Sequence, residues 1–298
     1  MKAQIRGVNT GIALVQVLLL ISILSVLLLY LTDMARKQVA VAQISQYRVQ
    51  SQIELFNAES IIAFELLTRE KFVNELNTGS NFIDWNFYGQ RFSLLNTSEI
   101  ELQDQAGLLS LNYVDCEKLV PALRQYGIPH ARSNFICRLL IDAQDPDDVV
   151  TSSTTLESNS YSVRLPNTMF THKQQLQELN LFSQEEIVAL TNLLTVHSTG
   201  WLNPYLSDEK LIASLSSNEE ADMVAAARQI GFVSLVDFQS IVNIAPDESV
   251  WFNFSNNIDV TISSTVGEIT MVKKSIWNVN PYASGASGPI NELNISKL

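Results

Sequence analysis

The chain opens with a run of apolar residues from Gly11 to Leu31, and no charged side chain occurs from Gly7 through Thr32. An α-helix rises about 1.5 Å per residue, so twenty residues span roughly the 30 Å of a bilayer's hydrocarbon core. The pattern therefore predicts a membrane-spanning helix over residues 12–31.

Beyond this span the pattern becomes amphipathic. Residues 33–77 contain neither proline nor glycine, and apolar or small residues recur there at intervals of three and four, which places them on one face of a helix. The residues of this stripe are Val49, Ile53, Phe56, Ser60, Ala63 and Leu67. We predict that the stripe is buried, and that residues 12–79 form one continuous rod ending near Gly79, a favourable residue just beyond a helix terminus.

After residue 79 the spacing of apolar positions changes from helical to alternating. Residues 80–112 carry aromatic and alternating apolar positions, which predicts short strands. Residues 248–298 return to this pattern, and Gly267 interrupts the β-rich stretch from Val250 to Val279, as expected for a hairpin.

Between these two stretches, residues 113–247 show mostly helical patterns. Thr168–His197 is also predicted to be helical, with a capping box before Ile187–Leu194 in which Ser183 and Glu186 satisfy each other's backbone. The order of helix, strands, helices and strands predicts an α+β fold. In it the long N-terminal helix packs on an antiparallel sheet, and a large all-α domain is inserted into the sheet's sequence.

The flanks of the apolar run predict its orientation. Lys2 and Arg6 precede it without an acidic residue, and basic flanks stay in the cytoplasm, so the rest of the chain is expected outside the inner face. A removable secretory signal is the competing interpretation, but it would have an apolar region of about 7–15 residues and a small-x-small cleavage site. The residues after Leu31, from Thr32 to Arg36, offer no such site. We predict a single retained span.

Charge and cysteine content narrow the function. The formal net charge of -12 argues against a nucleic-acid surface, which needs clustered lysine and arginine. The two cysteines are Cys116 and Cys137. An exported protein usually pairs its cysteines, and closing a loop of about 20 residues is worth roughly 3 kcal/mol. The alternative is two buried thiols packed as small apolar groups.

Arg6, Gly11 and the sequence Ile12-Ala13-Leu14 immediately precede the apolar run. They resemble the cleavage and methylation site of the prepilin peptidase, and the chain resembles the large K-type (GspK-like) minor pseudopilin of the type II secretion system. The resemblance implies a pilin-like fold and a prepilin leader over residues 1–11. The peptidase would cut after Gly11 on the cytoplasmic side, leaving Ile12 as the methylated N-terminus and the helix in place.

Shorter motifs extend the resemblance along nearly the whole chain. Asn57-Ala58-Glu59 is similar to the family's Gly-Ala-Glu in the long helix, and Gly107 to Asn112 resembles its strand-to-helix junction. Asn203-Pro204 resembles a later helix start, although the residues that follow differ. Asp142 to Asp147 is similar to the family's Asp-Trp-x-Asp-x-Asp element, with Ala143 in place of tryptophan.

Gln16 occupies the fifth position of the mature chain that this cleavage would produce. Ordinary pilin-like subunits carry glutamate there, which is thought to pair with a neighbour's N-terminal amine. A carboxylate without a partner at bilayer depth costs about 2.5–3.5 kcal/mol. A subunit with nothing above it has no amine to meet, so Gln16 fits a tip position. The simpler interpretation is a tolerated amide near the interface.

An acidic loop supplies hard oxygen ligands of the kind that Ca²⁺ prefers. The resemblance implies calcium binding near this loop, and the expected ligands are Asp142, Asp145, Asp147 and Glu157. The alternative is a solvated turn whose aspartates cap helix ends.

The sequence gives little support for catalysis. His130, His172 and His197 are spread over separate predicted segments, without the spacing of a zinc motif or a recognisable nucleophile turn. We predict a non-enzymatic protein of the inner membrane with its C-terminal domain in the periplasm. The resemblance implies I- and J-type minor pseudopilins and the prepilin peptidase as partners, in a tip complex that nucleates and caps the fibre for secretion across the outer membrane. The alternatives are a minor pilin of a type IV pilus, or a signal-anchored periplasmic ligand-binding protein or hydrolase.

Overall fold

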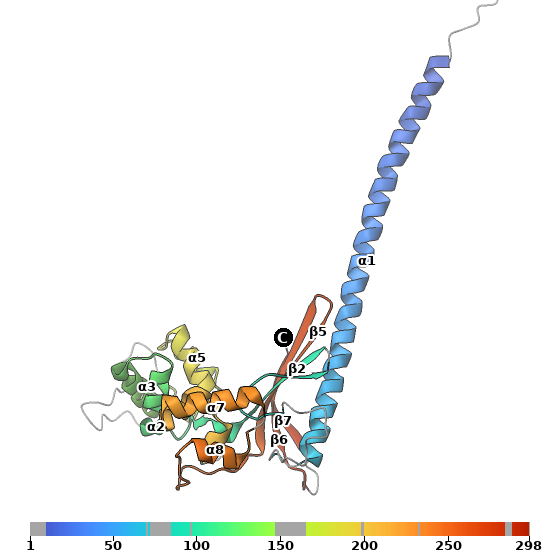
Figure 1. Ribbon diagram of the computed structural model, residues 1–298. Helices are drawn as coiled ribbons and strands as arrows, with labels where there is room; N and C mark the ends of the chain where they lie inside the picture. Colours follow the sequence, from blue (N-terminus) through green and yellow to red (C-terminus); the bar gives the residue numbers. More distant parts are fainter. Residues whose placement is uncertain are drawn as a thin grey trace, which may run out of the picture.

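A computed structural model gives the architecture of the chain. It describes residues 10–69, 71, 85–95, 97–146, 165–197, 200–231, 233–283 and 288–297. One helix, α1 (Thr10–Thr68), runs without interruption through the membrane-span candidate and most of the amphipathic segment. It ends before Gly79, the expected terminus, and Gly79 lies outside the described residues. Its first half projects alone, and its second half lies beside the sheet, with the remaining helices on the far side of the sheet (Figure 1).

The sheet has five antiparallel strands in the order β1-β2-β5-β6-β7. Their bounds are β1 Phe92–Leu95, β2 Ser98–Asp104, β5 Asn257–Val266, β6 Ile269–Val279 and β7 Ile290–Lys297. Strands from the two ends of the domain's sequence pair directly, with Ile100 opposite Ile262. Alternate residues of β2, β5 and β6 are buried on one face, as half-buried strands require.

The hairpin prediction at Gly267 is confirmed. Strands β5 and β6 pair from Asn257 and Asn278 to Val266 and Ile269, and Gly267 between them has φ of 59°, a left-handed conformation that glycine adopts without strain. A Cβ at this position would lie 2.7 Å from the ring of Tyr47. The turn therefore presses directly against α1.

The predicted buried stripe of α1 is wrong for Val49, Ile53, Phe56 and Ser60, which are exposed, whereas Ala63 and Leu67 near the end of the helix are partly buried against the core. The residues that α1 buries are Ser51, Leu55, Ala58, Ile62 and Leu66. Both sets follow helical spacing, so periodicity alone does not choose between them. The buried set contains small residues that allow close approach to the strands, and the Ser51 hydroxyl donates to the Ser264 carbonyl at 2.8 Å.

The segment between the two parts of the sheet is mainly helical. Its elements are η2 Gln105–Gly107, β3 Leu109–Ser110, α2 Cys116–Gln125, α3 His130–Asp142, α4 Gln175–Glu178, α5 Gln184–Leu193, β4 Leu194–Thr195, η4 Pro204–Leu206, α6 Glu209–Leu215, α7 Asn218–Ile230 and α8 Leu235–Ile241. The two short strands β3 and β4 pair in parallel.

The segment predicted to be helical over Thr168–His197 contains two helices, α4 and α5, followed by the short strand β4. Asn180, with φ of 51°, stands between them, and asparagine is one of the few residues that enter the left-handed region readily. Chain direction changes there, and α5 starts afresh. The predicted capping box at Ser183 and Glu186 is confirmed, since each side chain bonds the other's backbone.

The helices are divided between two hydrophobic cores. Helices α2 to α5 bury their apolar residues in one core, to which Leu211 of α6 also contributes. Ile212 of α6 joins helices α7 and α8 in the core that they share with the sheet and α1. Phe238 of α8 illustrates the second group, because it stacks edge-on against Phe252 just before β5. Residues 113–247 were expected as one inserted domain, but only their first part, α2 to α5, has a core separate from the sheet.

Candidate assembly interface

The first half of α1 is an exposed apolar surface. Apolar side chains from Leu14 to Leu31 are at least half exposed, and α1 is long and apolar enough to cross a membrane. Gln16 lies on this exposed part. Gly11 and Ile12 lie in the first turn of α1, and their side chains are outside the described part of the structure. Such a surface requires lipid or other apolar helices around it.

The second half of α1 carries a second exposed apolar surface, opposite the sheet. It consists of Val49, Ile53, Phe56 and Phe64, each about half exposed or more, and we call it the outer stripe. Its spacing of four, three and eight keeps the four side chains on one helical face. Polar residues such as Gln38 and Gln46 separate the outer stripe from the apolar first half of α1.

A buried ion cluster fastens the other face of α1 to the sheet. Lys273 of β6 is 6% exposed, and its ammonium donates to Glu59 of α1 at 2.5 Å and to Glu292 of β7 at 2.8 Å. Burial opposes the charge of Lys273, but the hydrogen bonds and charges of the two glutamates outweigh it and raise the pKa of the lysine. The cluster therefore joins three elements that are far apart in the sequence.

The ion cluster gives a structural role to the Asn57-Ala58-Glu59 motif. Ala58 is fully buried against the sheet, and Glu59 accepts the bond from Lys273. Sequence reasoning did not identify Lys273. One signal was available, because strict alternation places Lys273 on the same face of β6 as Ser275 and Trp277, both of which are buried.

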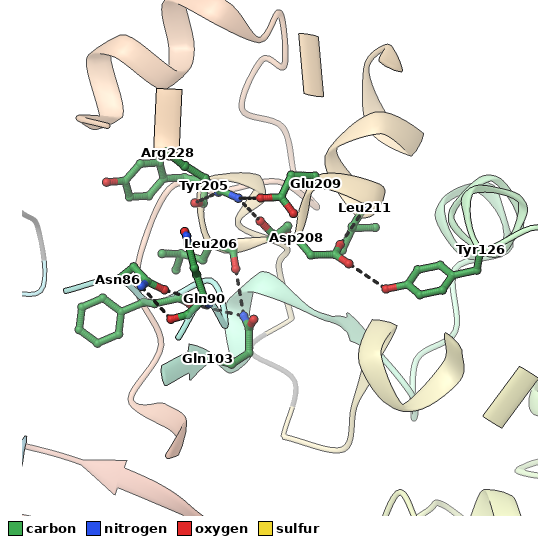
Figure 2. Close-up of polar contacts among 12 residues, drawn as sticks. Asn86, Gln90, Gln103, Tyr126, Tyr205, Leu206, Asp208, Glu209, Leu211 and Arg228 are labelled. Atoms are coloured by element: carbon green, nitrogen blue, oxygen red, sulfur yellow. Dashed lines mark hydrogen bonds and ion pairs between the residues drawn. The ribbon is translucent and has the colours of Figure 1, made fainter. Parts of the chain in front are cut away.

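A tight joint connects the helical segment to the outer face of the sheet. The Gln103 amide donates to the Leu206 carbonyl at 2.9 Å, and Figure 2 shows these two groups facing one another. Gly107 lies directly against the same carbonyl, so that a Cβ on Gly107 would collide with it. Asp208 caps α6 and also accepts from the Tyr126 hydroxyl of α2 at 2.8 Å.

Arg228 of α7 completes this joint. Its guanidinium donates to the Tyr205 carbonyl at 2.9 Å and to the Ser207 carbonyl at 3.0 Å, and it lies 3.7 Å from the ring centroid of Tyr88. Figure 2 places Arg228 beside Tyr205 and Glu209. A buried guanidinium with these partners is costly to move, so α7 and η4 form a rigid unit on the sheet.

A disulfide and an ion pair hold the separate helical core together. Cys116 begins α2 and is bonded to Cys137 of α3, with 5.8 Å between their Cα atoms. Arg132 of α3 donates to both carboxylate oxygens of Glu186 in α5. The hydrogen bond from Arg132 is the main cause of the lowered pKa of Glu186. This part of the molecule is stabilised independently of the sheet.

Two of the four expected calcium ligands lie in the described structure. Asp142 ends α3 and is buried, and Asp145 follows in the next turn and is exposed. Asp147 and Glu157 lie outside the described residues. Over the described ranges, no group of three histidine, cysteine or acidic side chains could hold a metal ion, and two carboxylates are too few for the 6–8 oxygens that Ca²⁺ takes. Calcium binding stays a prediction.

The three histidines occupy separate elements or loops. His130 begins α3, while His172 precedes α4 and His197 follows β4. Burial lowers the pKa of His197, and the nearby charges of Lys173 and His172 act in the same direction. The structure does not join them to any motif that the sequence singled out.

Comparison with known proteins gives one informative result. No protein-family model matches the chain, and no curated protein matches it. A chain of the crystal structure of the GspK-GspI-GspJ complex from the enterotoxigenic Escherichia coli type 2 secretion system is similar in structure, with a TM-score of 0.51 and 16% identity over 88% of this chain and 98% of that chain. The chain therefore has the pilin-like α+β fold of the GspK structure, as the sequence predicted.

Proposed function

We propose that the chain is the K-type minor pseudopilin at the tip of a type II secretion pseudopilus. The observation that carries the proposal is the architecture of α1, whose first half is bare and apolar while its second half is fastened to a pilin-like sheet. The similarity to the GspK-GspI-GspJ structure supports the K-type assignment. The role is structural, and the chain performs no chemistry of its own.

Two surfaces support assembly with I- and J-type minor pseudopilins. The bare half of α1 packs against other apolar helices within the inner membrane, where close van der Waals contact drives association. The outer stripe continues this contact in the periplasm, because half-exposed phenylalanines at helical spacing fit the grooves of a neighbouring helix. The ion cluster at Lys273 fixes the angle between α1 and the sheet, so that both surfaces are presented in one orientation.

The helices on the far side of the sheet explain how the chain would cap the fibre. Helices α2 to α8 lie there, away from α1 (Figure 1), and the joint around Gly107 and Arg228 holds them firmly. A subunit arriving above would meet this mass rather than a free apolar helix. Gln16 fits the same position, since a tip subunit has no neighbour above to supply an amine.

The partner proposal is tested by co-purifying the full chain with I- and J-type minor pseudopilins in mild detergent. We expect the wild type to form a stoichiometric complex, and Phe56→Lys with Phe64→Lys to lose it, because two charges would enter an apolar contact. The matched control is Gln52→Lys with Thr68→Lys, which adds the same charge at exposed positions. Equal recovery of the complex with both double variants would contradict the outer stripe as an interface.

The tip position is tested separately by gold labelling of a C-terminal tag on purified fibres. We expect one label at one fibre end, and labels distributed along the fibre would rule out a capping subunit. Intact mass measurement of the protein from membranes tests processing. Loss of residues 1–11 with a methyl group on Ile12 is the expected result, and an intact Met1 would favour a simple signal anchor.

A further inference from the structure

Two tryptophans lie beside one another on the surface, far from α1 in the sequence. Trp201 precedes η4, and Trp251 precedes β5. Their backbones are joined by a parallel bridge between Leu202 and Val250. The Leu202 amide donates to the Ser249 carbonyl at 2.8 Å, and the Trp251 amide donates to the Leu202 carbonyl at 3.0 Å.

The bridge determines which way the indoles face. Leu202 and Val250 are each 4% exposed and point into the protein. Side chains alternate along extended backbone, so Trp201, just before Leu202, and Trp251, just after Val250, leave the backbone on the side opposite to these two residues. Trp201 is partly buried there. Trp251 is 53% exposed, so part of its indole is accessible to a ligand.

The two tryptophans line an open, shallow pocket of about 240 Å³, whose other lining residues are Gly200, Glu248 and Asn253. The pocket is smaller than the roughly 300–1,000 Å³ that accommodates drug-sized ligands. Its polar groups are one carboxylate and one amide. Within the described ranges, neither the Glu248 carboxylate nor the Asn253 amide group is engaged by another side chain, so both are available to a ligand.

The polar groups are held in place by their own backbone contacts. Asp247 accepts from the Ser249 amide at 2.6 Å and from the Val250 amide at 2.8 Å, which forms a tight turn around Glu248. The Asn203 amide group donates to the Asn253 carbonyl at 3.0 Å and fixes the other rim. The pocket is thus organised before any ligand arrives, which lowers the entropy cost of binding.

We infer that this tryptophan pocket binds a saccharide with glucose-like configuration. In such a pyranose the substituents are equatorial, so each ring face presents only C–H groups, and these stack on the flat face of an indole. Vicinal hydroxyls then lie at the ring's edge, where a carboxylate accepts and an amide both donates and accepts. Two indoles, one carboxylate and one amide around a space for one sugar ring match this chemistry.

A protein contact is the main competing explanation for exposed tryptophans. A stable protein interface buries about 800 Å² per partner around such anchors. The structure instead gives a small concave space with polar groups on its rim, and this favours a small polar ligand with apolar faces. The inference is independent of the proposed assembly function.

The test is isothermal titration calorimetry of the full chain in lipid nanodiscs, which avoids sugar-based detergents. The probes are cellotriose and chitotriose, which differ in the hydroxyl or acetamido group at C2. We expect at least one to bind at millimolar concentration or tighter, with Trp251→Ala weakening it about tenfold or more. Glu248→Gln should also weaken it, whereas Trp251→Phe should retain part of the affinity. The matched control is Tyr282→Ala, which removes another highly exposed aromatic side chain.

Several outcomes would overturn the inference. They are failure of both probes to bind at millimolar concentration, and binding that Trp251→Ala leaves unchanged. A third is that neither saccharide binds, while the chain binds a partner subunit or protein-free phosphatidylglycerol vesicles in a way that depends on Trp251. That result would identify the surface as a protein or membrane contact. Thermal melts of each variant ensure that lost binding does not reflect lost folding, and Trp251→Phe provides a second folded variant at the same position.

Discussion

Replacing Lys273 by methionine removes the central cation of the ion cluster while keeping most of the side chain's length and apolar contact. The change leaves the carboxylates of Glu59 and Glu292 without the positive charge that neutralises them. Methionine cannot donate to either carboxylate, so both lose their hydrogen bonds at 2.5 and 2.8 Å. We expect the contact between α1 and the sheet to weaken.

The exposed fractions of the three side chains determine how much unfolding free energy the Lys273→Met variant loses. Breaking a fully buried ion pair costs about 3–5 kcal/mol, and an exposed pair contributes only about 0.2–1 kcal/mol. Lys273 is 6% exposed, but Glu59 and Glu292 are 20% and 24% exposed, so water partly compensates the abandoned carboxylates. We expect a loss of about 2–3 kcal/mol, which corresponds to about 5–10 °C in melting temperature for a chain of this size.

Near-ultraviolet circular dichroism of the full chain in nanodiscs measures this loss as a shift in thermal midpoint. Lys274→Met is the matched control, because Lys274 is the next residue and its side chain is exposed. The raised pKa of Lys273 gives a second check. Its stabilisation is complete below the ordinary lysine pKa of about 10.4 and is lost as pH rises through the folded value above it. Equal midpoints for the two variants would refute the role of the cluster.

Four further results are expected. Gly107→Ala should destabilise the chain by about 1–3 kcal/mol, because the joint has no space for a Cβ, and chemical denaturation measures this. Serine at Cys116 and Cys137 should cost about 3 kcal/mol, and a reductant should lower the wild-type midpoint to that of the variant. Glu186→Gln should destabilise at neutral pH, and the gap should close as pH falls below about 4.3 and through the lowered folded pKa, since protonation ends the pair with Arg132. Millimolar Ca²⁺ should raise the melting temperature relative to chelator, and identical melts would remove the calcium prediction.

The sequence was most informative where one local signal had one structural outcome. The apolar run, the hairpin at Gly267 and the capping box at Ser183 were predicted on this basis, and the structure contains all three as expected. Each depends on residues within a few positions of one another. The α+β class followed from the order of these elements, and the pilin-like fold from the resemblance to the K-type pseudopilins.

The sequence was misleading or silent where two local patterns were equally possible, or where contacts between distant residues determine the structure. Helical spacing on α1 is satisfied by two faces, and each contains one serine and one alanine, so only the contact with the sheet decides which face is buried. The tryptophan pocket was missed because its two halves, around Trp201 and Trp251, are joined by one backbone bridge between segments about fifty residues apart.

Within the described part of the chain, nothing covers the first half of α1. If the chain assembles as proposed, each helical turn that leaves the bilayer has to gain an apolar neighbour at once, because each square ångström of apolar surface left in water costs about 25 cal/mol. Extraction from the bilayer and growth of the filament would then be one coupled step, and a subunit that stalled would return to the lipid.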